Sequence, residues 1–255
     1  MTPQIIVLLF SAGLLGGVLN AAAGGGAFLA FPALLFSSVP PVAANATSTV
    51  ALWAGTTASG GAYRRKLKFS WRGAVPLIVT SMIGGLAGAF LLLQTPAHAF
   101  MGILPWLMLL ATLLCATGKK IAGRFFGTLD HQPTTAQLVL ACIFEFFAAL
   151  YGGYFGGGVG IINLALLATL GMLSDINAMN AFRVMLGVVS NGVAVLAFVA
   201  NGVVYWPQGV VTMIGAVIGG YFGAHYAMRV PPQWIRGFVI LVGTGMTVYF
   251  FVKAY

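Results

Sequence analysis

Three long stretches without a charged side chain constrain the fold of this chain more than any other feature of its sequence. No Asp, Glu, Lys or Arg occurs in residues 1–63, 73–118 or 184–228. Because about 20 apolar residues span the hydrocarbon core of a bilayer, each stretch is long enough for more than one crossing. A soluble domain carries about 25% charged residues, whereas this chain carries 6%. The sequence therefore predicts an all-α polytopic membrane protein rather than a soluble domain.

Two glycine triplets interrupt the apolar stretches, one in each half of the chain. They consist of Gly24, Gly25 and Gly26 in the first half, and of Gly156, Gly157 and Gly158 in the second. Glycine is a poor helix former, and a bilayer tolerates such breaks only where the backbone is buried in protein or lines a cavity. Interruptions at corresponding places in the two halves of a membrane protein point to a transporter's binding site.

The triplets belong to a longer internal repeat. At a constant offset of 135 residues, the matched pairs are Asn45 and Asn180, Trp71 and Trp206, Gly84 and Gly219, Gly85 and Gly220, and Pro96 and Pro231. The triplets themselves align at an offset of 132. Matches of Trp, Pro and Asn in one register predict two homologous repeats. We place these repeats at residues 1–117 and 135–255, joined by a linker at 118–134.

Each repeat is expected to contain five helices. The predicted ranges are 4–22, 26–37, 42–62, 73–93 and 99–117 in the first repeat, and 135–155, 159–173, 177–200, 207–228 and 235–252 in the second. The segment 26–37 is about 18 Å long at 1.5 Å per residue, well below the ~30 Å of a hydrocarbon core. Each repeat is therefore predicted to have a helix pair interrupted by glycine, plus three transmembrane helices.

Basic residues predict how the two repeats are oriented, because Lys and Arg accumulate in cytoplasmic loops. The connection from Arg64 to Arg72 is strongly basic, but its counterpart at 201–206 has no charge. Conversely, Arg229 and Arg236 lie in a connection whose counterpart in the first repeat is uncharged. The linker between the repeats is basic and is expected to be cytoplasmic. An inverted repeat with both termini outside accounts for this exchange of charge, and a parallel repeat is the alternative.

The sequence around the triplets is similar to a known family. The motifs GGVLNAAAGGGAFLAFPALL at 16–35, PPVAANATS at 40–48 and YGGYFGGGVGIINLALL at 151–167 resemble the TauE/SafE sulfite exporter family, also called the toluene sulfonate uptake permease family. The second copy departs from the pattern where Leu164 replaces Pro32, so its half-helix is expected to be less sharply bent. The resemblance covers nearly the whole chain. It implies a multi-pass carrier in the bacterial inner (plasma) membrane for sulfite, sulfoacetate or other sulfonates.

Physical chemistry points independently to an anion. A helix N-terminus presents unpaired N–H donors and about half a positive charge, and helices that start after Gly26 and Gly158 would direct them at the breaks. Glycine also lets an oxyanion approach the backbone closely. The alternative is that the glycines only allow tight helix packing. We expect this packing role for Gly84, Gly85 and Gly88 and for their copies in the second repeat.

Polar side chains on the third predicted helix of each repeat are further candidates for substrate binding. They are Asn45, Thr47 and Ser48 in the first repeat and Asn180 in the second, with Asn20 and Asn163 beside the triplets as weaker candidates. Amide and hydroxyl groups can bind a sulfonate without a buried counter-charge. The alternative role is helix capping or hydrogen bonding between helices.

Two ionisable residues inside predicted helices are also candidates. Arg183 is a candidate for substrate binding, because its guanidinium suits a sulfonate or a carboxylate and intramembrane charges usually face an interior or a cavity. Snorkelling and pairing with Glu145 are the alternatives for this arginine. Glu145 itself is a candidate carrier of a coupling proton, or a structural partner. His225 is expected to be a packed or interfacial residue.

These features favour a secondary transporter that works by alternating access, coupled to protons or operating as a uniporter, with an anion channel as the alternative function. No Walker motif occurs in the sequence, and the paired acids or His cluster of a membrane enzyme are missing from it. We expect no enzymatic activity, no cofactor and no metal. The expected partners are a small anion and the lipid bilayer, with no nucleic acid, and a homodimer is compatible with the sequence.

Overall fold

The computed structural model describes residues 1–63, 71–125, 134–170, 176–227 and 232–254, and in these ranges the regular secondary structure is entirely α-helical. The first half contains α1 (Pro3–Ala23), α2 (Ala27–Phe36), α3 (Pro41–Tyr63), α4 (Trp71–Gln94) and α5 (Ala97–Phe125). The second half contains α6 (Thr135–Tyr154), α7 (Val159–Leu170), α8 (Ile176–Ala200), α9 (Trp206–Ala227) and α10 (Pro232–Ala254). The prediction of an all-α chain with five helices in each half is confirmed.

The ends of the helices follow local sequence signals. α6 begins at a capping box, in which the N–H of Gln137 donates to Thr134 Oγ1 (3.3 Å) and the N–H of Thr134 donates to Gln137 Oε1 (2.9 Å). Two donors that a helix start would leave unpaired are thereby satisfied. α5 runs to Phe125 rather than ending at 117 as predicted. The polar Lys and Arg residues that follow Thr117 are good helix formers, as is Ala122, and the helix continues through them despite Gly118 and Gly123.

Among the residues that the structure describes, five helical segments are long and apolar enough to cross a bilayer. They are Pro3–Ala22, Trp71–Gln94, Ala97–Thr117, Thr135–Tyr154 and Ala178–Ala200. α2 is apolar, but its ten residues extend only about 15 Å. α3 carries Asn, Ser and Thr side chains, most of them buried against other helices. Polar groups of α3 therefore lie inside the bundle, where they are shielded from lipid.

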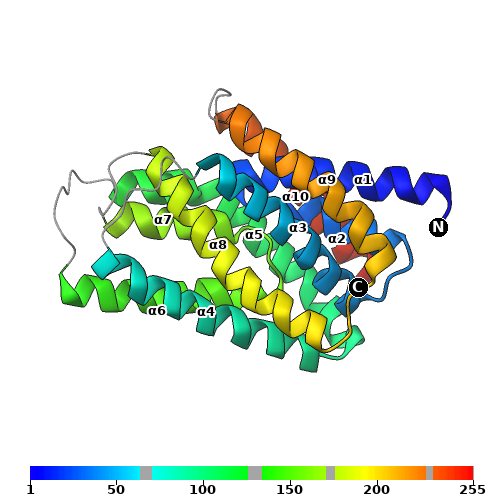
Figure 1. Cartoon of the computed structure of the whole chain (residues 1–255), viewed down its shortest axis with the longest axis horizontal. Helices are drawn as coiled ribbons and strands as arrows, with labels where there is room; N and C mark the ends of the chain where they lie inside the picture. Colours follow the sequence, from blue (N-terminus) through cyan, green and yellow to red (C-terminus); the bar gives the residue numbers. More distant parts are fainter. Residues whose placement is uncertain (64–70, 126–133, 171–175, 228–231, 255) are drawn as a thin grey trace.

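The helices of the two halves pack against each other in matching pairs (Figure 1). α1 lies along α9, while α6, the counterpart of α1, lies along α4, the counterpart of α9. In the same way, α3 packs on α9 and α8 packs on α4. The corresponding helices α3 and α8 pack together, as do α5 and α10. The two halves thus exchange partners instead of folding as separate units.

α1 and α6 run in opposite directions along the long axis of the molecule. In Figure 1, α1 starts at the end marked N and runs away from it, whereas α6 starts at the opposite end and runs toward the N-terminal end.

Most of the basic residues that were used to predict the orientation of the repeats lie outside the described part of the chain. Of the connection from Arg64 to Arg72, the structure describes only Trp71 and Arg72, at the start of α4. Arg229 and the side chain of Arg236 are also outside the described part of the chain.

Glycines allow the helices to cross at backbone distance. A side chain on Gly220 of α9 would collide with the carbonyl group of Gly55 in α3, and one on Gly85 of α4 would collide with the carbonyl group of Ser190 in α8. The two crossings are equivalent, because Gly85 and Gly220 correspond in the repeat, as do Gly55 and Ser190. Small residues let membrane helices approach closely. The expected packing role is confirmed for the whole group, Gly84, Gly85, Gly88, Gly219, Gly220 and Gly223.

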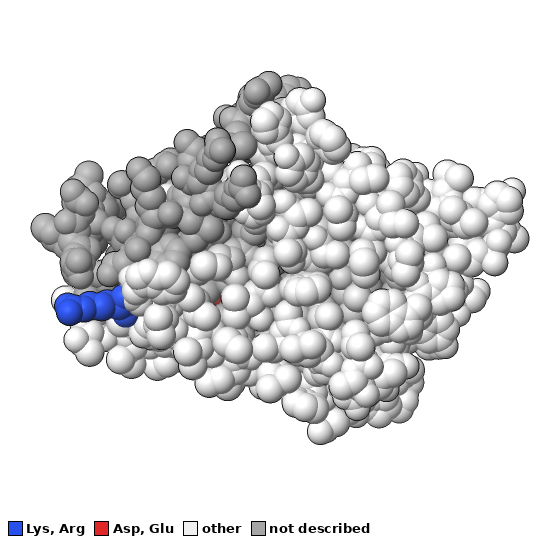
Figure 2. Space-filling model, viewed as in Figure 1, with Lys and Arg blue, Asp and Glu red and all other residues white. Residues whose placement is uncertain are grey.

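The outer surface of the bundle is apolar. Large hydrophobic side chains are exposed on the outer helices, among them Phe147 of α6, Leu196 of α8 and Leu241 of α10. Figure 2 shows one face, whose described part carries basic atoms at one end and is otherwise almost entirely uncharged. Trp71 and Trp206, which begin α4 and α9, are exposed, as expected for anchors at a membrane–water interface.

Candidate functional site

The two glycine breaks lie against each other inside the bundle. Gly24 follows α1 in the left-handed conformation with φ +77°, and its counterpart after α6, Gly156, has φ +84°. Glycine adopts such φ values without steric cost. The N–H of Gly158 donates a hydrogen bond of 3.0 Å to the carbonyl oxygen of Gly24. The structure thus brings the two predicted breaks into direct contact.

Arg183 of α8 lies at this junction. Its side chain is 4% exposed, and its Nη2 donates a hydrogen bond of 2.8 Å to the carbonyl oxygen of Ala21 in the last turn of α1. A Cβ atom on Gly24 would lie 3.3 Å from Nη1, and Gly160 of α7 also contacts the guanidinium. Within the described part of the chain, Nε has no hydrogen-bond partner. Arg183 therefore does not snorkel to the surface, but caps α1 beside the first break.

Neutral groups occupy the equivalent place at the second break. Nδ2 of Asn45 donates a hydrogen bond of 2.8 Å to the carbonyl oxygen of Tyr154, the last residue of α6. Oγ1 of Thr49 lies 3.8 Å from the position that a Cβ atom on Gly156 would take. α8 of the second half thus caps α1 of the first, and α3 of the first half caps α6 of the second. Each half closes the broken helix of the other.

The remaining predicted polar candidates lie on the same two helices. Ser48 is buried, and its hydroxyl donates to the carbonyl oxygen of Asn45 within α3 (2.9 Å). Oγ1 of Thr47 accepts a hydrogen bond from the N–H of Tyr205 (3.0 Å) and so holds the connection that precedes α9. Asn180 is partly buried on α8, one turn before Arg183. The bond of Thr47 thus joins α3 to another segment, which was the alternative role, whereas the bond of Ser48 stays within its own helix.

Two further helices cover the breaks. A Cβ atom on Gly25 would lie 2.8 Å from Val239 Cγ1 of α10, and one on Gly158 would lie 3.1 Å from Ala111 Cβ of α5. α10 therefore covers the first break, and its counterpart α5 covers the second.

Asn20, one of the weaker candidates for substrate binding, makes a hydrogen bond between helices. Its Nδ2 donates to Oγ1 of Thr56 in α3 at 2.7 Å.

Sequence reasoning missed three participants in this arrangement, Ala21, Tyr154 and Gly160. Ala21 and Tyr154 contribute backbone carbonyl groups, which no pattern of side chains reveals. Gly160 follows the second triplet by two residues, and its counterpart in the first repeat is Phe28. That difference between the two copies was the signal that could have marked Gly160 as a contact point.

Comparison with known proteins identifies the family of this chain. The family model described as Sulfite exporter TauE/SafE matches residues 9–250. The chain belongs to the TauE/SafE family. Among its relatives is a "Probable membrane transporter protein" of Haemophilus influenzae, which is 26% identical over 245 residues, covering 96% of this chain and 93% of the relative.

Two further relatives of this TauE/SafE protein match over similar lengths. The "Probable membrane transporter protein YfcA" of Escherichia coli is 27% identical, with 97% of this chain and 90% of the relative covered. The "Probable membrane transporter protein ORF9" of Sinorhizobium is 24% identical, with 96% and 92% covered. No solved structure matches the chain.

Glu145 of this TauE/SafE chain lies in the interface between α4 and α6. Its side chain is completely buried, and Oε1 accepts a hydrogen bond of 2.9 Å from the hydroxyl of Ser81. Oε2 has no hydrogen-bond partner among the residues described. The partner of Glu145 is thus a serine of α4, whereas Nη2 of Arg183 binds α1. The two side chains therefore do not form the Glu145–Arg183 pair that was the alternative expectation.

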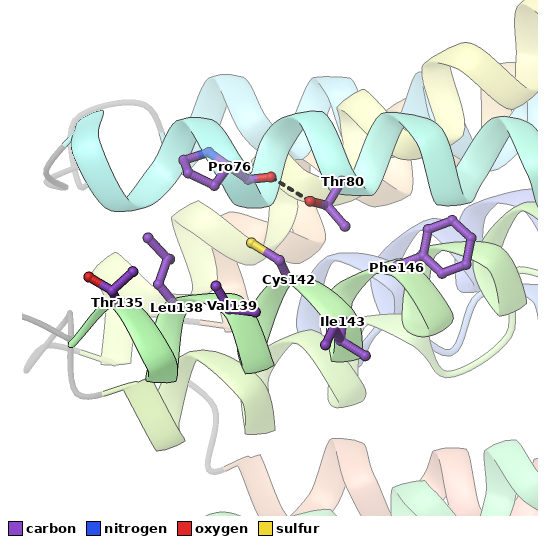
Figure 3. Close-up of a pocket in the computed structure, with 8 residues that line it drawn as sticks. All are labelled: Pro76, Thr80, Thr135, Leu138, Val139, Cys142, Ile143 and Phe146. Carbon is purple, nitrogen blue, oxygen red and sulfur yellow. Dashed lines mark hydrogen bonds between the residues drawn. The ribbon is translucent and has the colours of Figure 1, made fainter.

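A hollow of about 490 Å³ opens in the surface of the TauE/SafE chain between α4 and α6 (Figure 3). It is lined by Pro76, Thr80, Thr135, Leu138, Val139, Cys142, Ile143 and Phe146. The hydroxyl of Thr80 donates to the carbonyl oxygen of Pro76 in its own helix (2.7 Å). This lining contains no charged side chain, so it lacks the positive charge that the junction at Arg183 offers to an anion.

Proposed function

We propose that this protein is a secondary transporter of small organic or sulfur-containing anions, such as sulfite, sulfoacetate or other sulfonates. It works by alternating access and resides in the bacterial inner membrane. The names of the family and of the relatives support the class of transporter and the sulfur-containing substrate. The chemistry of the joined breaks supports an anion.

The observation that carries the proposal is the buried cation at the junction of the two breaks. Arg183 is 4% exposed, and the hydrogen bond of its Nη2 goes to the neutral carbonyl group of Ala21. Insertion data put the cost of an Arg at the centre of a membrane helix at about 2.5–3.5 kcal/mol, and such residues mark substrate pathways. A sulfonate beside the guanidinium would bring a counter-charge, and its oxygens suit the planar N–H fork of arginine.

The arrangement of the two halves supports alternating access. We propose that they form an inverted repeat, because α1 and α6 run in opposite directions and corresponding helices exchange partners. Many secondary transporters are built in this way, with the substrate site near the bilayer midplane between discontinuous helices. One half would rock against the other about the joined breaks and so open the site to each side in turn.

Glu145 is the proposed carrier of a coupling proton. Carboxyl groups inside membrane helices are rare and commonly belong to proton relays. Oε2 of Glu145 is buried and has no hydrogen-bond partner in the described part of the chain, so it is free to take up a proton without breaking a bond. Ser81 would hold the carboxyl group in place through Oε1.

Anion flux into proteoliposomes tests the proposed function. The wild type should accumulate radiolabelled sulfite or sulfoacetate with saturable kinetics. Arg183→Gln should lower the initial rate by about tenfold to a hundredfold, the equivalent of losing hydrogen bonds to a charged group. Arg72→Gln is the matched control, because Arg72 is an exposed arginine at the start of α4, and it should transport normally.

Two results would contradict the proposal. Equal flux through the wild type and Arg183→Gln would remove Arg183 from the site. Flux of single-channel magnitude that does not saturate would identify an anion channel in place of a carrier.

A further inference from the structure

We propose that the second break binds a sodium ion, at a site formed by Asn45, Thr49 and the end of α6. The location of this site follows from the contacts of the second break. Its role in driving anion transport rests on the proposed function. The ion would neutralise the negative partial charge at the C-terminus of α6, as the guanidinium of Arg183 does at the C-terminus of α1.

Oxygen atoms gather where α6 ends. Thr49 Oγ1 and the carbonyl oxygen of Gly152 lie 3.8 Å and 3.6 Å from the position that a Cβ atom on Gly156 would take. The hydroxyl of Thr49 donates to the backbone carbonyl oxygen of Asn45 (3.0 Å). Asn45 is completely buried, and its Oδ1 has no hydrogen-bond partner among the described residues. A buried acceptor without a hydrogen-bond partner destabilises the protein, because it has lost its hydrogen bonds to water. A cation bound by Oδ1 would satisfy it.

The orientation of the Asn45 amide decides which kind of ligand fits. Its Nδ2 donates to the carbonyl oxygen of Tyr154 (2.8 Å), and turning the amide over would set two acceptors against each other. The atom of the Asn45 side chain that remains without a partner is therefore Oδ1, which is a hydrogen-bond acceptor. An acceptor oxygen binds a cation and repels an anion, so Asn45 belongs to a cation site and not to the anion site for which its sequence made it a candidate.

The charge at the two breaks differs in a way that a cation would balance. The C-terminus of a helix carries about half a negative charge, and at α1 the guanidinium of Arg183 meets it through Ala21. The residue that corresponds to Arg183 in the first repeat is Ser48. Ser48 is neutral and uses its hydroxyl inside α3. The end of α6 thus receives the neutral amide of Asn45 where the end of α1 receives a positive charge.

Gly156 leaves space for an ion, and the ligands favour a monovalent one. Apart from its two chain neighbours, the described atoms that a Cβ on Gly156 would meet within 4 Å are the oxygens of Gly152 and Thr49. At the first break the equivalent position is filled, because a Cβ on Gly24 would lie 2.7 Å from Gly160 Cα. Calcium and magnesium sites are built with carboxylates, whereas these ligands are a carbonyl, an amide and a hydroxyl.

The contact between the breaks would couple the two ions. Gly156 lies two residues before Gly158, whose N–H is bonded to the carbonyl oxygen of Gly24. Gly24 in turn lies against the guanidinium of Arg183. Ordering of the second break by sodium would therefore position Arg183 for the anion. Linkage requires that sodium and the anion then raise each other's affinity by the same factor.

Sodium binding to the purified full-length protein tests the site directly. We expect saturable binding of radioactive sodium in a scintillation proximity assay at constant ionic strength, displaced by unlabelled NaCl and not by KCl or choline chloride. The melting temperature should be higher in NaCl than in KCl or choline chloride. Thr49→Val keeps the side-chain shape and removes a ligand, so it should weaken sodium binding by about tenfold or more.

Thr212→Val is the matched control. Thr212 is buried, as is Thr49, and each hydroxyl donates to the carbonyl oxygen four residues earlier in its own helix: Thr49 to Asn45 in α3 (3.0 Å) and Thr212 to Gln208 in α9 (2.9 Å). Sodium affinity should be unchanged in this variant. Asn45→Ala should lose sodium binding altogether if it folds, and Thr49→Val decides the question if it does not.

Three outcomes would overturn the sodium site: absence of saturable sodium binding to the wild type, equal affinity of the wild type and Thr49→Val, or equal displacement by KCl. The measurement is independent of anion transport. Loss of the sodium site with intact sulfite flux would refute this inference alone. Sodium binding without flux of any sulfur-containing anion would refute the proposed function and leave the sodium site standing.

Discussion

Gly24 and Gly160 touch across the two halves of the protein. A Cβ atom on Gly24 would lie 2.7 Å from Gly160 Cα, and one on Gly160 would lie 3.0 Å from Gly24 Cα. A Cβ atom on either glycine would also approach Nη1 of Arg183, to 3.3 Å from Gly24 and to a clash from Gly160. The absence of side chains at these two positions thus lets a single guanidinium reach the backbone of both breaks, one from each half of the chain.

Gly160→Ala should therefore destabilise the protein and impair transport. The added methyl group would meet the backbone of Gly24 and the guanidinium of Arg183, and overpacking of this kind costs about 1–3 kcal/mol. Thermal unfolding in detergent measures the stability, and sulfite flux measures the displacement of Arg183. The control is Gly245→Ala in α10, which is exposed with open space around it and should gain up to about 1 kcal/mol. Equal melting temperatures for the two variants would contradict the contact.

The existence and the pairing of the breaks could be predicted from the sequence. The glycine triplets are visible in the sequence as interruptions of apolar stretches, and the matched Trp, Asn and Pro residues give the register of the repeat. The structure adds what depends on backbone geometry. The hydrogen bond from Gly158 to Gly24 joins two main-chain groups, and no pattern of side chains encodes it.

The roles of individual polar side chains could not be predicted, because a helix pattern does not tell which neighbour a side chain meets. Thr47 and Ser48 are adjacent in sequence, yet one accepts from Tyr205 N–H and the other donates within α3. Asn45 was identified as a polar candidate near a break, but the carbonyl of Tyr154 determines that its free atom is an acceptor. Arg183 was correctly placed inside a helix, while its partner is a backbone oxygen.

Asn45→Ala should destabilise the protein by about 1–3 kcal/mol, the cost of leaving a buried carbonyl group unsatisfied. The variant removes the donor to Tyr154 at the end of α6. The control is Thr57→Ala, which removes an exposed hydroxyl bonded to its own helix at Trp53 and should change stability by less than about 0.5 kcal/mol. Thermal unfolding of the two variants beside the wild type gives the comparison, and an Asn45→Ala protein as stable as the control would show that Tyr154 needs no cap.

Glu145→Gln separates proton coupling from a structural role. The amide oxygen can still accept from Ser81, whose hydroxyl bonds Oε1, so we expect a folded protein with a melting temperature near that of the wild type. Accumulation of sulfite driven by a pH gradient should be lost, because glutamine cannot carry a proton, while exchange of sulfite across the membrane without a gradient should continue. Ser81→Ala removes the bond and keeps the carboxyl group, and it should retain coupling. Full pH-driven accumulation by Glu145→Gln would exclude this residue as the proton carrier.

The starts of α4 and α9 provide a direct test of the inverted repeat. Trp71 and Trp206 correspond in sequence, each begins its helix, and both are exposed. In an inverted arrangement, equivalent residues lie on opposite sides of the membrane. Because Lys and Arg accumulate in cytoplasmic loops, we expect the start of α4, which follows the basic connection, to face the cytoplasm. Single cysteines at these positions, Trp71→Cys and Trp206→Cys, can be introduced after replacing Cys115 and Cys142 by Ala. A membrane-impermeant maleimide added to intact cells should label Trp206→Cys and spare Trp71→Cys until the membrane is permeabilised.

Labelling of both from the same side would establish a parallel repeat, and a rocking motion of inverted halves would then no longer explain alternating access.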